Sequence, residues 1–217
     1  MLSISLVVTV FVTFVLLLIG EYLSRRKRKT DPEISRKFVH ISVGSFVAFW
    51  PLFLTWNQIL LMSAAFLAVI VVSQYFRIFK VIRTVQRPTW GIGFFAIIVG
   101  LLALVTQDGW IFAAAVLHMS LADGFAAIVG MRYSKKNGRY TVFGHTKSVI
   151  GSSTFAAISL LILVGYIIGS GHHLPLAVLL GITAVATLLE NVSAYGLDNL
   201  TVPLFVAFVL ERINTLQ

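Results

Sequence analysis

Long apolar blocks, separated by short polar stretches, run along the whole chain. Most of these blocks approach ~20 residues, the length that an α-helix needs to cross a bilayer core of ~30 Å. Eight blocks are candidate membrane spans, and the last is short enough to tilt or re-enter, which would leave seven. We therefore expect an all-α fold, a polytopic integral membrane bundle of about eight transmembrane helices. The candidate spans cover residues 2–22, 38–54, 58–76, 90–106, 110–131, 148–169, 174–193 and 201–213.

The composition supports a single membrane domain over residues 1–217. Of the 217 residues, 58% are hydrophobic, whereas a soluble domain is roughly half apolar. Residues 1–35 are expected to form the first span and a basic loop, and residues 36–205 the main bundle. The chain contains no cysteine, which excludes disulfides, thiolate metal sites and a cysteine nucleophile.

Positive charge is concentrated in alternate loops, which share one face of the membrane. The first loop carries seven of the 17 Lys and Arg residues, the third carries four and the fifth carries five. By the positive-inside rule this face is cytoplasmic, and both termini then lie outside. A net charge of +9 beside apolar blocks fits anionic lipid or an anionic substrate better than nucleic acid. The loop residues are Arg25, Arg26, Lys27, Arg28, Lys29, Arg36, Lys37, Arg77, Lys80, Arg83, Arg87, Arg132, Lys135, Lys136, Arg139 and Lys147.

Asp123 lies inside the fifth apolar block. A carboxylate at depth costs ~2.5 kcal/mol or more on insertion scales, so it should face the bundle interior with a partner. Ala127 and Gly130 follow on the same helix face and leave space for a ligand; the alternative is a structural ion pair with close helix packing. Five further acids at block boundaries are expected to be solvated: Glu21, Asp31, Glu33, Asp108 and Glu211.

Glu190 and Asp198 flank the last loop, which lies on the same face as the basic loops. Gly196 can break a helix there, and Pro203 fits near the first turn of the next one. Asp198 and Asn199 offer oxygen ligands of the kind that Mg²⁺ prefers. The alternative is that these two residues only cap a helix.

Basic residues border two further blocks. Arg36, Lys37 and His40 enter the second block, where they could reach phosphates or act as snorkelling anchors. Lys147 precedes the hydroxyl- and glycine-rich segment 148–154 at an expected helix start, which suits an anion, although those hydroxyls could equally cap the helix. The remaining histidines lack metal-ligand spacing and are expected to be boundary residues: His118, His145, His172 and His173.

These acidic, amide and basic groups are all expected at one face of the membrane. Acids can hold a metal ion, while cations neutralise phosphate charge as it redistributes in a transition state. The residues therefore predict an anionic cofactor and Mg²⁺ at the cytoplasmic interface.

Four ordered blocks resemble the polyprenol kinase family, which includes dolichol kinase, phytol kinase and the CTP-dependent diacylglycerol kinase. That family is in turn similar to phosphatidate cytidylyltransferases. The resemblance covers most of residues 36–203, including the catalytic part of the bundle. Where dolichol kinase has a glutamate this chain has Ile150, which looks closer to the phytol kinase form and favours a shorter isoprenoid alcohol. The blocks read Arg36-Lys-Phe-Val-His40, Asp123-Gly-Phe-Ala-Ala-Ile-Val-Gly130, Lys147-Ser-Val-Ile-Gly-Ser152, and Glu190 with Asp198-Asn-Leu-Thr-Val-Pro203.

The resemblance implies phosphoryl transfer from a nucleoside triphosphate, usually CTP and otherwise ATP, to a lipid alcohol at the cytoplasmic face. It implies catalytic roles for Asp123, Glu190 and Lys147, and metal binding by Asp123 and Asp198. The candidate nucleotide-binding residues are Arg36, Lys37, His40, Gly130, Lys147, Ser148, Gly151, Ser152 and Asn199.

Two other functions stay open at this point. One is cytidylyl transfer to phosphatidate, which releases pyrophosphate instead of a nucleoside diphosphate. The other is a proton- or cation-coupled carrier, in which Asp123 and Glu190 would form a relay. The sequence leaves the lipid acceptor, the nucleotide and the oligomeric state undetermined.

Overall fold

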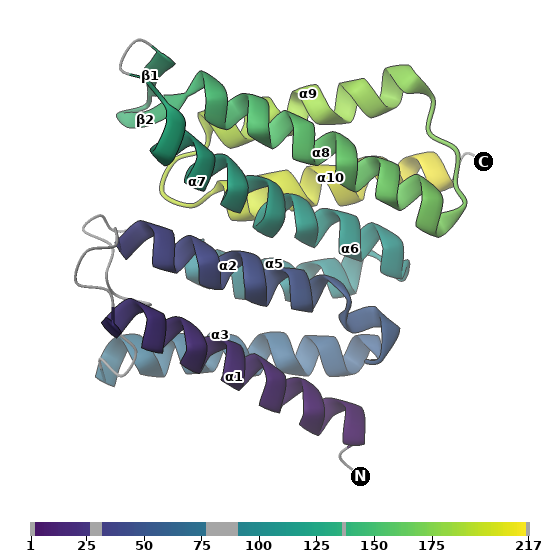
Figure 1. Cartoon of the computed structure of the whole chain (residues 1–217). Helices are drawn as coiled ribbons and strands as arrows, with labels where there is room; N and C mark the ends of the chain where they lie inside the picture. Colours follow the sequence, from purple (N-terminus) through teal and green to yellow (C-terminus); the bar gives the residue numbers. More distant parts are fainter. Residues whose placement is uncertain (1–2, 27–31, 77–90, 136–137, 216–217) are drawn as a thin grey trace.

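The computed structural model describes residues 3–26, 32–76, 91–135 and 138–215, which form a helical bundle with a small β-hairpin (Figure 1). A π-helical turn joins α6 to α7 into one continuous helix. The elements are α1 (Ile4–Arg26), α2 (Pro32–Ala48), η1 (Trp50–Leu52), α3 (Trp56–Phe76), α5 (Gly91–Val105), α6 (Gly109–Leu117), η2 (His118–Ala122), α7 (Asp123–Tyr133), β1 (Arg139–Val142), β2 (His145–Ser148), α8 (Val149–Ser170), α9 (Leu176–Val192) and α10 (Asp198–Asn214).

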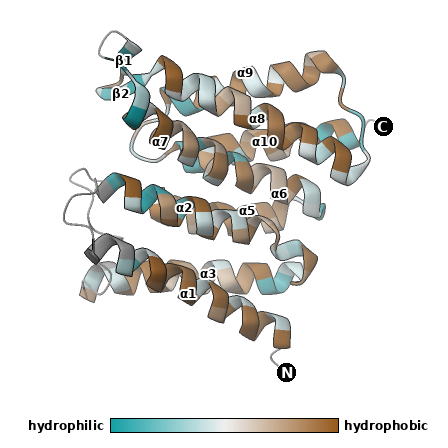
Figure 2. Cartoon of the chain, viewed as in Figure 1, coloured by the Kyte–Doolittle hydropathy of each residue, from teal (hydrophilic) through white to brown (hydrophobic). Residues whose placement is uncertain are grey.

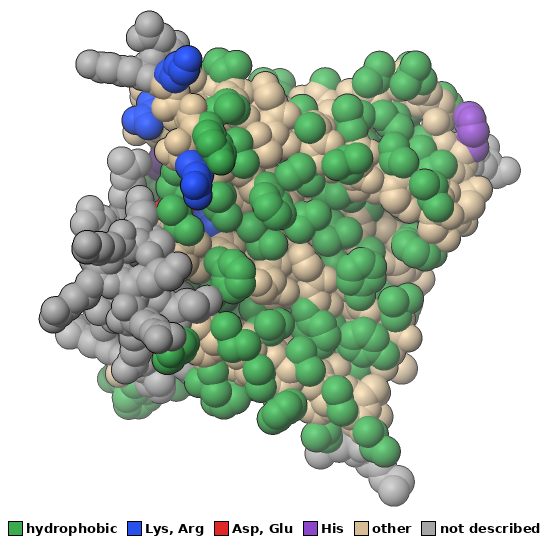
Figure 3. Space-filling model, viewed as in Figure 1, with side chains coloured by type: hydrophobic (Ala, Val, Ile, Leu, Met, Phe, Trp, Pro, Cys, Tyr) green, Lys and Arg blue, Asp and Glu red, His purple; other side chains and the backbone are tan. Residues whose placement is uncertain are grey.

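Four helices in the described ranges are long and apolar enough to cross a membrane: α1, α3, α8 and the continuous helix from α6 to α7. The helices α5 and α9 are apolar but shorter. Figure 3 shows hydrophobic side chains over most of the visible surface, as contact with lipid requires. These features confirm the all-α membrane bundle. Counting α6 to α7 once, the described residues hold eight helices besides the short turn η1, while eight membrane crossings stay a prediction.

The continuous helix from α6 to α7 is the core of the bundle. It packs against α2, α8 and α10, while α3 packs on α5 and α1 packs on α2. In the most apolar 18-residue stretch of this helix 72% of the residues are buried, against 28–33% in the corresponding stretches of the other three long helices. A polar group on this helix is therefore held inside the protein and away from lipid.

Polar groups gather at one end of the bundle. Figure 2 shows hydrophilic residues at the hairpin and at the start of α2, and Figure 3 shows Lys and Arg side chains near the hairpin. Both ends of the chain lie at the opposite end (Figure 1), as the alternating loops predict. Which end faces the cytoplasm stays a prediction. The basic residues predicted for the third loop, with Lys27, Arg28, Lys29, Asp31 and Lys136, lie outside the described residues.

Several helix boundaries differ from the predicted spans, and those of α2 and α10 differ for reasons that the structure shows. α2 begins at Pro32 and ends at Ala48, before the turn that contains Pro51, because proline is favoured at the first helical position and cannot continue a helix. The helix α10 begins at Asp198. Pro203 therefore lies inside α10 and not near its start, whereas the break at Gly196, with a φ of 88°, is as predicted.

The hairpin was not predicted from the sequence. β1 and β2 pair antiparallel around Phe143 and Gly144, whose φ values are 47° and 78°. Such a two-residue turn needs positive φ at both positions, and Asn-Gly or Asp-Gly is its usual signature. Lys147, expected at a helix start, lies on β2, and Ser148 caps α8.

Two residues that were expected at the boundaries of apolar blocks, Glu21 as a solvated charge and His118 as a boundary histidine, are buried. Glu21 is 7% exposed, because Gly20 lets α1 approach α2 so closely that an added Cβ would lie 2.1 Å from Val39 Cγ2. His118 is fully buried, with Nδ1 2.8 Å from the Ala114 carbonyl and Nε2 2.9 Å from Ser159 Oγ. Both predictions were wrong, because helix packing encloses these polar groups.

Candidate active site

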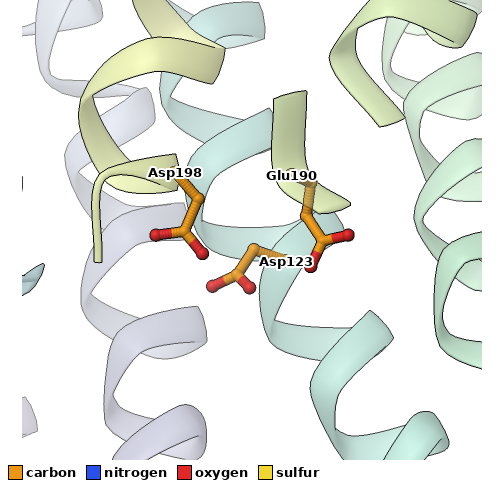
Figure 4. Close-up of side chains that lie close together, drawn as sticks. All are labelled: Asp123, Glu190 and Asp198. Atoms are coloured by element: carbon orange, nitrogen blue, oxygen red, sulfur yellow. The ribbon is translucent and has the colours of Figure 1, made fainter. Parts of the chain in front are cut away.

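Three carboxylates from three helices meet near the hairpin end of the bundle (Figure 4). Asp123 begins α7, Glu190 lies in the last turn of α9, and Asp198 begins α10. One oxygen atom of each carboxylate lies within 4.8 Å of one from each of the others. Asp123 and Glu190 are buried, and Asp198 is half-buried. Three like charges at this distance repel one another, so the cluster favours bound positive charge.

The donor set fits Mg²⁺, because carboxylate oxygens are its preferred protein ligands. The sequence predicted Asp123 and Asp198 as metal ligands and gave Glu190 a catalytic role. The structure brings all three together, so Glu190 is as well placed to hold an ion as the other two. The sequence gave no separate signal for this third ligand.

Two lysines supply positive charge to the cluster. Lys37 Nζ, from α2, lies 2.5 Å from Asp123 Oδ2, and both side chains are buried. Lys147 Nζ, from β2, donates hydrogen bonds to the Glu190 carbonyl oxygen at 2.8 Å and to the Glu190 carboxylate. Each ammonium group thus lies beside one carboxylate, and both lie where phosphate oxygens could also be bound.

Lys147 stays protonated in this position. Burial lowers the pKa of Lys147, but the adjacent Glu190 carboxylate and its hydrogen bond outweigh that effect and raise the pKa above its ordinary value. An ammonium group that keeps its charge can neutralise phosphate oxygens throughout the physiological pH range.

The π-helical turn directly precedes Asp123. The backbone N–H of Asp123 donates to the carbonyl oxygens of His118 and Ser120. Next to this turn, α2 approaches closely: a Cβ added to Gly44 would lie 2.2 Å from Ser120 Cβ, and one added to Gly124 would lie 2.2 Å from Ile41 Cγ1. π-helical turns inside α-helices are frequent at functional sites, and this one sets the direction in which Asp123 points.

The other predicted residues of α2 differ in their relation to the cluster. His40 Nε2 lies 3.0 Å from the Met119 carbonyl oxygen and 3.7 Å from Asp123 Oδ2, so His40 borders the site. Arg36 pairs with Glu33 on its own helix. A phosphate-binding role for Arg36 stays a prediction.

The two predicted glycines lie at the contact between α7 and α8. A Cβ added to Gly130 would lie 2.9 Å from Ser148 Oγ, and one added to Gly151 would lie 3.1 Å from the Ala126 carbonyl oxygen. Ser148 Oγ in turn accepts a hydrogen bond from Gly151 N at 3.1 Å. These glycines therefore bring α8 and the hairpin close to the helix of Asp123, and their contact with a nucleotide stays a prediction.

Asn199 and Ser152 are engaged within the protein. Asn199 Nδ2 donates to the Gly91 carbonyl oxygen at 2.8 Å, which ties the start of α10 to α5. Ser152 Oγ lies 2.7 Å from Asn191 Oδ1 and 2.6 Å from the Tyr140 hydroxyl. Asn191 and Tyr140 were not predicted: Asn191 adjoins Glu190 in the sequence, but Tyr140 reaches the site only through the hairpin.

Comparison with known proteins gives one family. The chain is 35% identical over 195 residues to the phytol kinase of Synechocystis sp., an alignment that covers 86% of this chain and 82% of that protein. No family profile matches the chain, and no solved structure matches it.

Proposed function

The chain belongs to the polyprenol kinase family, which includes phytol kinase, and we propose that it is a membrane lipid kinase. In this proposal it transfers the γ-phosphoryl group of a nucleoside triphosphate to the hydroxyl group of an isoprenoid alcohol at the cytoplasmic face. The favoured donor is CTP. The observation that carries the proposal is the cluster of Asp123, Glu190 and Asp198 beside two lysines.

Each charged group has a role in this proposal. The three carboxylates would hold Mg²⁺, which would supply positive charge against the phosphate groups of the nucleotide. Lys37 and Lys147 bind phosphate oxygens from their positions beside Asp123 and Glu190. Asp123 or Glu190 accepts the proton of the lipid hydroxyl. The protein mainly positions the two substrates and neutralises phosphate charge, because phosphoryl transfer needs little covalent help from the protein.

A phosphoryl-transfer assay with purified protein in mixed micelles tests the proposal. The assay combines γ-labelled CTP or ATP, Mg²⁺, and a panel of phytol, farnesol, polyprenols and diacylglycerol, with chelated metal as the control. We expect label in one isoprenoid alcohol and release of a nucleoside diphosphate. Release of pyrophosphate with phosphatidate would replace the kinase by the cytidylyltransferase alternative, and nucleotide-independent ion flux in sealed vesicles would favour the carrier.

An apolar groove offers a place for the hydrocarbon of the acceptor. Its volume is about 460 Å³, and it runs between α6–α7 and α8 from Trp110 and Tyr166 to Phe125 on α7. We place the tail of the lipid alcohol there, because ligand sites for apolar groups are concave and lined by apolar and aromatic side chains.

Filling this groove is expected to weaken binding of the lipid alcohol and to leave nucleotide binding unchanged. A Cβ added to Gly165, which lines the groove, meets no atom within 4 Å, so Gly165→Phe should fold. We expect it to raise KM for the lipid alcohol by roughly tenfold, since lost apolar contacts are typically worth ~1–3 kcal/mol, without changing KM for the nucleotide. Gly181→Phe on α9, where an added Cβ also meets nothing within 4 Å, is the matched control. Equal KM values for both variants would place the tail elsewhere.

A further inference from the structure

A second polar cluster lies beside the carboxylates and joins the hairpin to α8 and α9. The Tyr140 hydroxyl donates a hydrogen bond to Asn191 Oδ1 and lies 2.6 Å from Ser152 Oγ. Asn191 Nδ2 donates to the Thr187 carbonyl oxygen at 2.8 Å, which fixes the amide so that Oδ1 faces Tyr140. The polar atoms of this cluster satisfy one another, which indicates a structural connection and not an open ligand site.

The pairing of the strands links this cluster to Lys147. Tyr140 lies directly opposite Lys147 in the hairpin, and directly opposed residues of an antiparallel pair project from the same face. Both side chains reach α9 at consecutive residues: Tyr140 bonds to Asn191, and Lys147 bonds to Glu190. The hairpin is thus anchored to α9 by two side chains next to each other.

We propose that Tyr140 is a positioning residue that holds the hairpin against α8 and α9 and so places the Lys147 ammonium group beside Glu190. A two-stranded hairpin by itself is marginally stable in water, so its position depends on its anchors. A further described anchor is the edge-on contact of His145 with Tyr195, at a centroid distance of 5.1 Å, in the loop before α10. The effect on nucleotide use rests on the function proposed for the carboxylate cluster.

Hydrogen exchange of the full chain in nanodiscs tests the anchor without any reaction. Tyr140→Phe keeps the ring and removes the hydroxyl. We expect amides of residues 139–148 to exchange roughly tenfold faster, the size that loss of one partly buried hydrogen bond gives, while the rest of the protein is unchanged. Tyr133→Phe is the matched control, because the Tyr133 side chain is exposed at the end of α7. Equal exchange in Tyr140→Phe and wild type would overturn the proposal.

Nucleotide affinity tests whether Tyr140 acts through Lys147. We expect Tyr140→Phe to weaken binding of Mg²⁺–CTP roughly tenfold in the wild-type background, but less than about twofold in a Lys147→Met background, since coupled residues are non-additive. A tenfold loss in both backgrounds would overturn action through Lys147. Wild-type protein that binds no nucleotide would overturn the kinase proposal, and the exchange comparison would still decide the anchor.

Discussion

Asp123→Asn is expected to lower kcat/KM for phosphoryl transfer by about 10²–10³-fold, the loss that follows when one group stabilising transition-state charge is removed. The substitution keeps the shape of the side chain. It removes the negative charge beside Lys37 Nζ and replaces one of the three carboxylates of the cluster by a neutral amide, a weaker ligand for Mg²⁺. Initial rates with labelled CTP over a range of Mg²⁺ concentrations measure both effects, and the half-saturating Mg²⁺ concentration should rise.

Two further variants separate this effect from loss of structure. Asp108→Asn makes the same chemical change at the N-cap of α6, where Asp108 accepts from the N–H groups of Trp110 and Ile111; asparagine caps equally well, so activity should persist. Asp123→Asn leaves the Lys37 charge buried without its partner, which is destabilising. Adding Lys37→Met removes that charge. Activity restored in the double variant would mean that Asp123 is only a structural ion-pair partner.

The position of Asp123 could be predicted from the sequence, because a carboxylate in the middle of an apolar block is costly to expose to lipid. Such an acid must find a partner inside the bundle. Its partner, Lys37, was predicted as a phosphate ligand, and the structure shows it bound to the carboxylate. The choice between these roles depends on the distance between α2 and α7, which the close approach at Gly124 determines. The distance between α2 and α7 cannot be derived from the order of residue types in the sequence.

Two local features escaped sequence reasoning for different reasons. The hairpin turn Phe143-Gly144 has Phe where Asn or Asp usually precedes the glycine of a two-residue turn, so Tyr140 could not be placed opposite Lys147. The π-helical turn inserts one residue into a helix without changing its composition. Without that insertion the direction of Asp123 relative to α6 cannot be derived from helical periodicity.

Lys147→Met is expected to lower kcat/KM by about 10²-fold, because a cation that neutralises phosphate charge in a preorganised site contributes about this much. The Glu190 carboxylate loses its ion pair in this variant, and the cluster becomes more negative. We therefore expect opposite shifts: KM for the nucleotide rises, while the half-saturating Mg²⁺ concentration falls. A general folding defect would instead weaken the binding of both the nucleotide and Mg²⁺.

Two comparisons make the result specific. Lys135→Met removes an exposed lysine from the same end of the bundle and should change neither constant, because an exposed charge is screened by solvent. Lys147→Arg keeps the charge but not the compact ammonium group, and it should recover only part of the lost activity. If Lys147→Met raised both constants together, Lys147 would serve only to hold Glu190. If it raised the nucleotide constant alone while Mg²⁺ binding tightened, the Lys147 ammonium group would be the phosphate ligand and the Glu190 carboxylate would belong to the metal site.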